Sequence, residues 1–418
     1  MMAKKERKII AKNKSETPKK ELSFSLLEVI IVMIITIVFG MMIGGLANSF
    51  KAPISTTKTR IQSESSLNEF VEVYNELKNK YYGEIKSEEM IEAGIEGMLN
   101  YLNDTYSVYM RDSSSRSFND EMDGEYVGLG VQITKVESGL IKILSVFPDS
   151  PAEKVGIKVD DEIVKVNNLE VKDTDIDRVV EEIRGKVGTK FDVVISRAGE
   201  EKSYKVTREA ITLTSVTGEI HERDNKKVAY LRVSTFAANT TSQFKKMLDS
   251  YVEKDKVSAV IVDLRNNTGG HLAVADSLAS LFLDKGKIIY QLKDKKETTV
   301  SKSTSPATYK IPVIFITNEG SASASEVLVA ALKENGLGLV VGKKTFGKSS
   351  VQTAKELSSG STIKYTIREW LTPKGNSLEE NGIDPDIEVE LADEYFETRE
   401  QEKDSQLMRA LTEAFKEE

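Results

Sequence analysis

The chain has 418 residues but no cysteine and only two histidines, His221 and His271. Without cysteine it can form no disulfide, and no thiolate can serve as a nucleophile or a metal ligand. Two histidines leave little scope for a histidine-rich metal site or for a Ser-His-Asp triad. The formal net charge of −8 argues against a nucleic-acid-binding protein, in which a basic face is expected. The length leaves room for two or three domains with sizeable cores.

The N-terminus carries a basic arm, 1–28, followed by an apolar stretch without a charge, 29–47. This stretch is about long enough to span a bilayer, and the positive-inside rule would then place the arm in the cytoplasm. A cleaved signal peptide is the alternative, because Gly45 and Ala47 suit a cleavage site, although the stretch is longer than a usual signal-peptide core. We expect a single-pass anchor in the cell membrane with an extracytoplasmic remainder. A polar linker, 48–64, follows it.

Two further regions precede the most informative part of the chain. Apolar residues recur at helical spacing from 65 to 102, which predicts two or three helices. Residues 111–123 have few apolar side chains and many Ser and Asp, so a loop is predicted there. Short strands and two short helices then alternate up to about residue 210. Gly128 and Gly130 open this part, in a loop whose backbone amides can point at an anion.

The second half of the chain repeats a strand–loop–helix pattern, at 257–283 and at 311–332. Such alternation predicts an α/β fold with adjacent strands, right-handed crossovers and functional loops at the carboxyl ends of the strands. The first of these loops contains Gly269 and Gly270, which alone would indicate no more than a tight turn. The second contains Ser323.

Ser323 allows two interpretations. With Glu326 three residues later it fits a capping box, in which the serine accepts from a helix N–H and the glutamate reaches back. It can instead be a nucleophile at a helix start, where exposed amides and the helix dipole favour negative charge. Such a serine needs a base, and Lys348 can serve if burial lowers its pKa. We expect Glu326 to act mainly as the cap.

Two stretches around these residues resemble the C-terminal processing peptidases, also called tail-specific proteases. They are G-S-A-S-A-S-E around Ser323 and K-T-F-G-K-S-S-V-Q, which ends at Gln352. The family uses a Ser/Lys dyad with a supporting glutamine, and the resemblance places these roles at Ser323, Lys348 and Gln352. Gln352 would orient the lysine amine, since residues four apart in an extended segment share a face.

The run D-L-R-N-N-T-G-G resembles the oxyanion-hole loop of the same family, with Thr268 where proline is more common. The resemblance makes the amide of Gly269 or Gly270, together with that of Ala324, the expected oxyanion donors. It implies peptide-bond hydrolysis through an acyl-enzyme and requires no metal or cofactor.

The order of elements in 118–210 resembles a PDZ domain, which binds a peptide C-terminus by strand addition while loop amides hold the carboxylate. The resemblance places those amides at Leu129, Gly130 and Val131, with a helix from Ile176 as the other wall of the groove. A purely structural lid is the alternative for this domain.

The expected architecture is therefore α/β and multidomain. The resemblance implies a crotonase/ClpP-like catalytic core at 211–395 with the inserted PDZ domain, a C-terminal helix at 396–418 and the transmembrane helix described above. It also implies an N-terminal helical segment at 65–117, which would dock or dimerise the chain, or form a small cap on the catalytic domain.

The expected function is an endopeptidase that cuts extracytoplasmic proteins with accessible, fairly apolar C-termini. Two alternatives remain. The chain could be a scaffold that binds protein tails through the PDZ domain without catalysis. It could also be a penicillin-recognising acyl-enzyme, because Ser242 and Lys245 match S-x-x-K, but the S-D-N and K-T-G partner motifs are missing.

Overall fold

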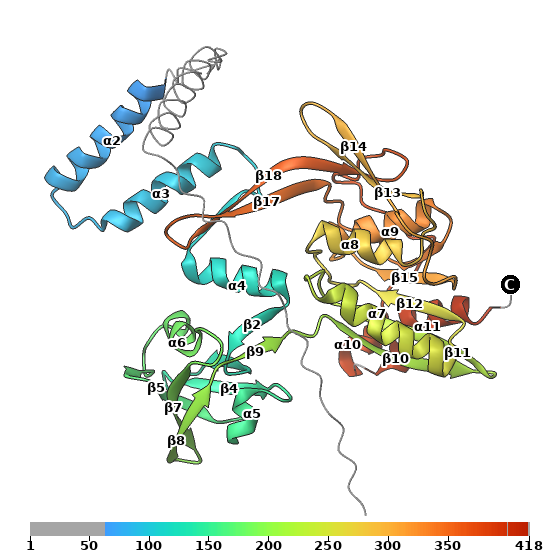
Figure 1. Cartoon of the computed structure of the whole chain (residues 1–418), viewed down its shortest axis with the longest axis horizontal. Coiled ribbons are helices and arrows are strands. Elements are labelled where there is room, and N and C mark those ends of the chain that lie inside the picture. The colour runs from blue at the N-terminus through green and yellow to red at the C-terminus, as the bar shows by residue number, and fades with distance from the viewer. Residues whose placement is uncertain (1–62, 399, 417–418) are drawn as a thin grey trace, which may run out of the picture. The chain divides into compact units, whose positions relative to one another are not determined.

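The computed structural model describes residues 63–398 and 400–416 (Figure 1). The chain divides into two compact units, Met1–Ser87 and Glu88–Glu418. The first unit contains helix α2, Ser63–Lys80, which exposes several large apolar side chains: Leu67, Phe70, Val71, Val73 and Leu77. Among the helices of the described ranges, none has the length and apolar character needed to cross a membrane, and the predicted anchor at 29–47 lies outside those ranges.

The second unit begins with elements that include a helix where a loop is predicted. The elements are α3 (Ser87–Asn100), β1 (Val108–Met110) and α4 (Asp112–Asp123). The loop prediction for 111–123 is wrong. Helix α4 is stabilised by polar contacts, which a search for periodic apolar residues does not detect. Arg116 pairs with Asp112 one turn earlier at 3.0 Å. Buried Ser115 shares a 2.6 Å hydrogen bond with Thr362, and Gly124 ends the helix in the left-handed conformation.

The region after α4 forms a small sheet domain, drawn in green in Figure 1. Strands β2 and β9 pair antiparallel, and a six-stranded sheet has the order β3-β4-β5-β7-β8, with β6 paired to β5. The cluster of buried apolar side chains in this domain includes Leu129, Ile143, Phe191 and Val193. The elements are β2 (Glu125–Gly128), β3 (Val131–Lys135), β4 (Ile141–Val146), α5 (Pro151–Val155), β5 (Glu162–Val166), β6 (Leu169–Glu170), α6 (Ile176–Ile183), β7 (Lys190–Arg197), β8 (Glu200–Thr207) and β9 (Glu209–Thr212).

A second six-stranded sheet forms the centre of the remaining chain, in the order β10-β11-β12-β15-β16-β19. Every neighbouring pair from β11 to β19 is parallel, so the carboxyl ends of β12 and β15 lie at the same edge. The loops with Gly269, Gly270 and Ser323 start there, as the sequence pattern predicts. The elements are β10 (Val216–Arg223), β11 (Lys226–Val233), α7 (Thr240–Ser250), η1 (Tyr251–Asp255), β12 (Ala259–Asp263), α8 (Leu272–Ser280), β15 (Val313–Thr317), α9 (Ala324–Glu334), β16 (Gly338–Gly342) and β19 (Ile387–Glu388).

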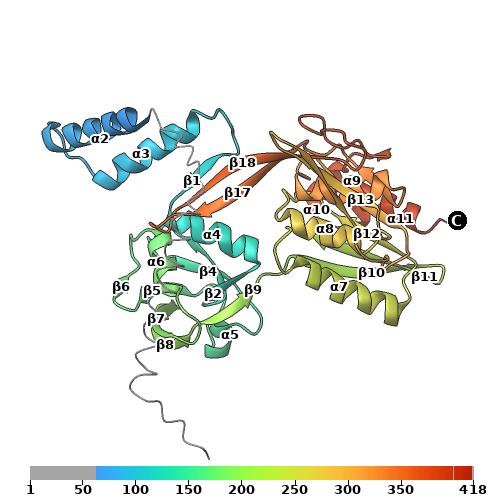
Figure 2. The same ribbon diagram turned by 45° about the horizontal axis from the view of Figure 1, so that its top comes forward.

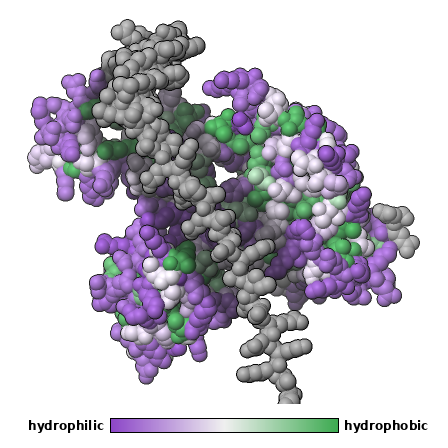
Figure 3. Space-filling model, in the orientation of Figure 1, coloured by the Kyte–Doolittle hydropathy of each residue, from purple (hydrophilic) through white to green (hydrophobic). Residues whose placement is uncertain are grey.

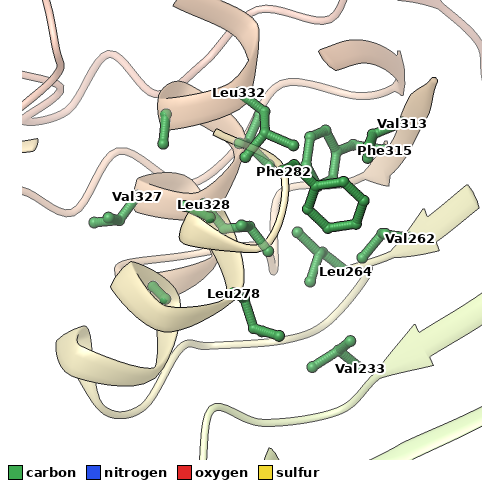
Figure 4. Close-up of a cluster of buried hydrophobic side chains, with 14 of the residues drawn as sticks. Val233, Val262, Leu264, Leu278, Phe282, Val313, Phe315, Val327, Leu328 and Leu332 are labelled. Atoms are coloured by element: carbon green, nitrogen blue, oxygen red, sulfur yellow. The ribbon is translucent and has the colours of Figure 1, made fainter. Parts of the chain in front are cut away.

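Helices cover both faces of this sheet, because alternate strand residues are apolar on each side. On one face Val262 and Phe315 pack with Leu278 of α8 and Leu328 of α9 (Figure 4). On the other face Ile261 and Ile316 belong to the cluster that includes Leu407, Ala410 and Leu411 of the C-terminal helix α11, Ser405–Ala414. Hydrophilic side chains predominate on the face of the molecule shown in Figure 3.

A five-stranded sheet completes the fold, in the order β1-β18-β13-β14 with β17 also paired to β18. Strands β17 and β18 run antiparallel as a long hairpin, shown in Figure 2. The elements are β13 (Ile288–Lys293), β14 (Thr298–Lys302), β17 (Ser350–Glu356), β18 (Thr362–Leu371), α10 (Asp393–Thr398) and η2 (Gln401–Lys403). Because β17 begins two residues after Lys348, the hairpin fixes where this lysine enters the site.

Candidate active site

A cavity of about 680 Å³ collects most of the predicted catalytic residues. Ser323, Lys348 and Gln352 line it together with Gly269 and Gly270. Its wall also has apolar side chains from α4, α8, β17 and β18: Phe118, Met122, Leu272, Val351 and Trp370. The cavity is therefore large enough for several residues of an extended peptide, and partly apolar.

Ser323 has a strained backbone at the start of α9. Its φ is 55° and its ψ is −115°, a conformation that costs a non-glycine residue about 1–3 kcal/mol. The N–H of Ser323 donates to Glu326 Oε2 at 2.8 Å, which is the glutamate half of the predicted capping box. The surrounding structure thus holds the serine in a turn that presents its side chain at the cavity.

Glu326 does more than cap the helix. Its completely buried carboxylate accepts hydrogen bonds from the N–H of Gly347 at 2.7 Å, the N–H of Lys348 at 2.9 Å and the hydroxyl of Thr345 at 2.6 Å. Burial raises the pKa of Glu326, while these bonds and the one from Ser323 oppose the shift. One carboxylate therefore fixes the backbone of both Ser323 and Lys348.

Lys348 lies in an environment that favours its neutral form. Burial lowers the pKa of its amine, and the positive charge of Lys364 lowers it further, against the opposing effect of Asp104, Glu379 and Glu326. In this structure its Nζ lies 4.1 Å from the centroid of the Tyr106 ring. Sequence reasoning missed Tyr106, which lies far from Lys348 in the sequence, in the segment between α3 and β1.

Gln352 lines the cavity but faces hydroxyl groups in this structure. Its Nε2 donates to Ser350 Oγ at 3.0 Å and to Thr366 Oγ1 at 3.1 Å. A register shift between Val351 and Gln352 interrupts the strict alternation by which residues four apart share a face. Between the side chains of Gln352 and Lys348 there is no hydrogen bond in the part of the chain that the structure describes.

The two glycines of the first loop differ in what their amides do. The N–H of Gly269 donates to Asn267 Oδ1 at 2.9 Å. The N–H groups of Gly270 and Ala324 make no hydrogen bond to another described residue. A Cβ on Gly269 would lie 2.9 Å from Ser323 Cβ and 3.0 Å from the Ala324 nitrogen, so only glycine allows this close approach. Gly270 is thus the better candidate for an oxyanion donor beside Ala324.

Asn267 ties this glycine loop to the serine loop. Its Nδ2 donates to the carbonyl of Val233 at 2.8 Å. The backbone carbonyl of Asn267 accepts from the N–H of Ala322 at 3.0 Å and from Ser325 Oγ at 2.9 Å. The loop is also anchored by a buried ion cluster, in which Arg265 bonds Asp263 on one side and Asp404 on the other. Sequence reasoning assigned no role to these three charged residues.

The predicted peptide-carboxylate loop is present in the small sheet domain. Leu129 is buried, Gly130 has a φ of 81°, and Val131 begins β3 and pairs with Val146. The backbone amides of Gly130 and Val131 interact with the hydroxyl of Tyr126. Burial raises the pKa of the Tyr126 phenol, and these two amides oppose the shift. Tyr126 was not found from the sequence, although it precedes the loop by only two residues.

The alternative S-x-x-K pair does not form a Ser/Lys site in this structure. Ser242 Oγ donates to the carbonyl of Asn239 at 2.8 Å, and Lys245 Nζ pairs with Asp249 at 2.6 Å. Both residues lie on α7, and neither lines the cavity.

Comparisons with known proteins agree with the resemblance seen in the sequence. Residues 227–389 match the sequence profile of Peptidase family S41, 142–197 match that of the PDZ domain, and 39–114 match that of the Activating protease CtpB N-terminal domain. The solved structure of the photosystem II D1 C-terminal processing protease is 26% identical, and the match covers 78% of this chain and 88% of that one with a TM-score of 0.44.

Curated relatives are named probable CtpA-like serine proteases. The one from Staphylococcus saprophyticus is 35% identical over 384 residues, which cover 91% of this chain and 76% of the relative. The one from Staphylococcus aureus strain COL is 37% identical, and the match covers 78% of this chain and 65% of the relative. The predicted family is thereby confirmed: this mixed α/β chain belongs to the S41 family of serine proteases and combines its peptidase domain with a PDZ domain.

Proposed function

We propose that this chain is a membrane-anchored serine endopeptidase that recognises protein C-termini and cuts peptide bonds with a Ser323/Lys348 dyad. The observation that carries the proposal is the bonding of Glu326. A single buried carboxylate binds the N–H of Ser323 and the N–H of Lys348, so the two loops are held at one cavity. A serine and a lysine of lowered pKa in one cavity are the pair that base-activated nucleophilic catalysis needs.

The reaction proceeds through an acyl-enzyme. Neutral Lys348 takes the proton of Ser323 Oγ as that oxygen forms a bond to the substrate carbonyl carbon. The amides of Gly270 and Ala324 stabilise the resulting oxyanion. Protonated Lys348 then gives its proton to the leaving amine as the C–N bond breaks. Water attacks the ester carbonyl carbon and passes a proton to Lys348; the bond between that carbon and Ser323 Oγ then breaks, and Lys348 returns the proton to Ser323 Oγ as the acid product leaves.

Forming the dyad requires the amine of Lys348 to move. Its Nζ must leave the face of the Tyr106 ring, 4.1 Å from the ring centroid, and reach Ser323 Oγ. The backbone of Lys348 can stay in place during this rotation, because its N–H is bound to Glu326 and its carbonyl accepts from Trp370 Nε1 at 2.9 Å. Gln352 would contact the amine only after a similar change of rotamer.

The PDZ domain would deliver the substrate tail. The amides of Leu129, Gly130 and Val131 would bind the terminal carboxylate, with the peptide added as a strand beside β3 and opposite α6. In this structure Tyr126 interacts with two of these three amides. A tail carboxylate would therefore compete with the phenol oxygen for these two amides.

The location of the enzyme is part of the proposal. Residues 29–47 would anchor it in the cell membrane with the catalytic part on the extracytoplasmic side. The apolar side chains that α2 exposes support a docking or dimerisation role for the N-terminal helical segment. Substrates would be proteins of the cell envelope with accessible, fairly apolar tails.

The test uses the full chain in detergent and a folded protein that carries an apolar C-terminal tail. We expect Ser323→Ala and Lys348→Ala to abolish cleavage, and an amidated tail to be cut more slowly than a free one. Ser242→Ala and Lys245→Ala are the matched controls and should leave the rate unchanged. Tail binding without cleavage, equal in wild type and variants, would contradict the catalytic proposal and favour a scaffold.

A further inference from the structure

The start of the C-terminal helix α11 meets the glycine loop in a buried cluster. Arg265 Nη1 donates to Asp404 Oδ1 at 3.0 Å, and Nη2 donates to Asp404 Oδ2 at 2.8 Å, across 139 residues of sequence. Nη1 also donates to Gln406 Oε1 at 3.1 Å. The side chains of Arg265 and Asp404 are 7% and 3% exposed, so water cannot readily replace these bonds.

The other side of the same guanidinium is held from within the loop. Asp263, the last residue of β12, accepts from Arg265 Nε at 3.0 Å and from Nη2 at 2.7 Å. It also accepts from the backbone N–H of Arg265 at 2.9 Å and from the hydroxyl of Tyr230 at 2.7 Å. The planar guanidinium is therefore fixed by a carboxylate on each side, which leaves it one orientation.

The position of Arg265 sets that of the candidate oxyanion donor. Two residues later Asn267 binds the N–H of Gly269 and the carbonyl of Val233, and its carbonyl receives the N–H of Ala322. Gly270 follows directly. A shift of the Arg265 backbone would thus pass through Asn267 to both halves of the predicted oxyanion hole, and an error of about 1 Å in such a site can cost roughly 100-fold in rate.

The helix would stay docked without its bond to Arg265. Leu407, Ala410 and Leu411 bury its apolar face against the sheet. Ser405 accepts from the N–H of Ala392 at 3.0 Å and donates to the carbonyl of Glu390, and these contacts do not involve Arg265. Asp404 Oδ1 also caps the helix, because it accepts from the N–H of Leu407 at 2.9 Å. An asparagine oxygen can keep this capping bond, so the bonding of Arg265 can be changed while the helix stays anchored.

We propose that Asp404 and Gln406 are positioning residues for the peptidase reaction, acting through Arg265 on the loop that carries Gly270. The proposal rests on the proposed oxyanion role of that loop. It makes the far C-terminus of the chain part of the catalytic apparatus, although it touches no substrate.

The experiment compares the full-length variants Asp404→Asn, Gln406→Ala and Ser405→Ala with wild type. Asn keeps the shape of Asp404 but turns a donor toward one guanidinium N–H. We expect kcat per active site, counted with a fluorophosphonate that labels Ser323, to fall about 10- to 100-fold in Asp404→Asn with KM within about twofold. Gln406→Ala should lose several-fold, and the control Ser405→Ala should keep kcat within about twofold.

A merely structural role for Asp404 would lower the melting temperature and the number of labelled sites but leave kcat per labelled site unchanged, and that result overturns the proposal. If Asp404→Asn does not fold, Gln406→Ala decides, because it leaves both Asp404 bonds intact; an unchanged kcat in that variant overturns the proposal as well. Cleavage by Ser323→Ala would instead contradict the proposed function. Failure of the positioning proposal and failure of the proposed function therefore give different results.

Discussion

Two buried charges of opposite sign hold the loops that meet at the cavity, and they are stabilised in different ways. Glu326 has only neutral partners, three backbone N–H groups and the hydroxyl of Thr345. Burial therefore raises its pKa. Arg265 lies between Asp263 and Asp404, and although burial alone would lower its pKa, the bonds to these carboxylates raise it.

The difference predicts separate roles for the two centres. The partners of Glu326 belong to the very loops that carry the serine and the lysine, so any change there alters the reacting groups directly. The partners of Arg265 belong to a strand end and to α11, so this centre acts as a frame for the glycine loop. Replacing Arg265 should affect stability as well as the position of the glycine loop, and replacing Glu326 should mainly affect catalysis.

The largest expected effect comes from Arg265→Met. It would leave Asp263 and Asp404 buried with no cation between them, and removing one partner of a buried ion pair costs about 3–5 kcal/mol. We expect the free energy of unfolding in urea to fall by about this amount. The double variant Arg265→Met/Asp404→Asn removes one of the stranded charges and should regain part of the loss. If Arg265→Met is as stable as wild type, the ion cluster does not stabilise the glycine loop.

Glu326→Gln should have the next largest effect, on rate rather than on stability. The amide keeps one oxygen but brings an NH₂ group toward N–H donors, so it cannot accept from Ser323 and Lys348, which share Oε2, and from the N–H of Gly347 at Oε1 at the same time. We expect kcat to fall about 100-fold with KM little changed. Glu334→Gln is the matched control, because this glutamate lies on the same helix and binds the N–H of Lys374 outside the cavity. Similar losses in both variants would contradict the role of Glu326.

The contrast also explains what the sequence could predict. The motifs predicted the family, and the apolar runs predicted the strands whose carboxyl ends carry the Gly269–Gly270 and Ser323 loops. The roles assigned to Ser323, Lys348 and the glycines stay predictions. The helix at Asp112–Asp123 was missed because distant Thr362 and ion pairs stabilise it, not periodic apolar residues.

Partners far apart in the chain were also beyond the sequence. Asp404 lies 139 residues after Arg265, and no local pattern pairs them. The sequence predicts Glu326 as a cap because Ser323 is its bonding partner nearest in sequence. Its bonds to Gly347 and Lys348 depend on how the chain between β16 and β17 is placed at the site. Local spacing predicts which residues lie at strand ends, but it does not predict which residues from distant parts of the chain bond to them.

A smaller effect is expected from pH and from Lys364. Catalysis needs neutral Lys348, so kcat should rise with pH, by up to tenfold per pH unit below the pKa of this amine. A flat profile of kcat from about pH 6 to 9 would count against Lys348 as the base.

Lys364→Met removes a positive charge that lowers the pKa of Lys348, so the rise in kcat should move to higher pH. Lys355→Met, an exposed lysine of the same hairpin, is the control and should leave the profile in place.

The smallest expected effect lies outside the catalytic loops, at Tyr126. Glu326 and Arg265 bond groups that no substrate needs, whereas the Tyr126 hydroxyl interacts with amides that the substrate carboxylate would need. Tyr126→Phe keeps the ring over Gly128 but removes the oxygen, so a tail should bind without displacing it. We expect the dissociation constant of an apolar tail peptide, measured by fluorescence anisotropy, to fall by a few-fold, with kcat unchanged. An amidated peptide should show no gain. Equal affinity of both proteins for the free-acid peptide would mean that the phenol does not compete with the tail carboxylate for these amides.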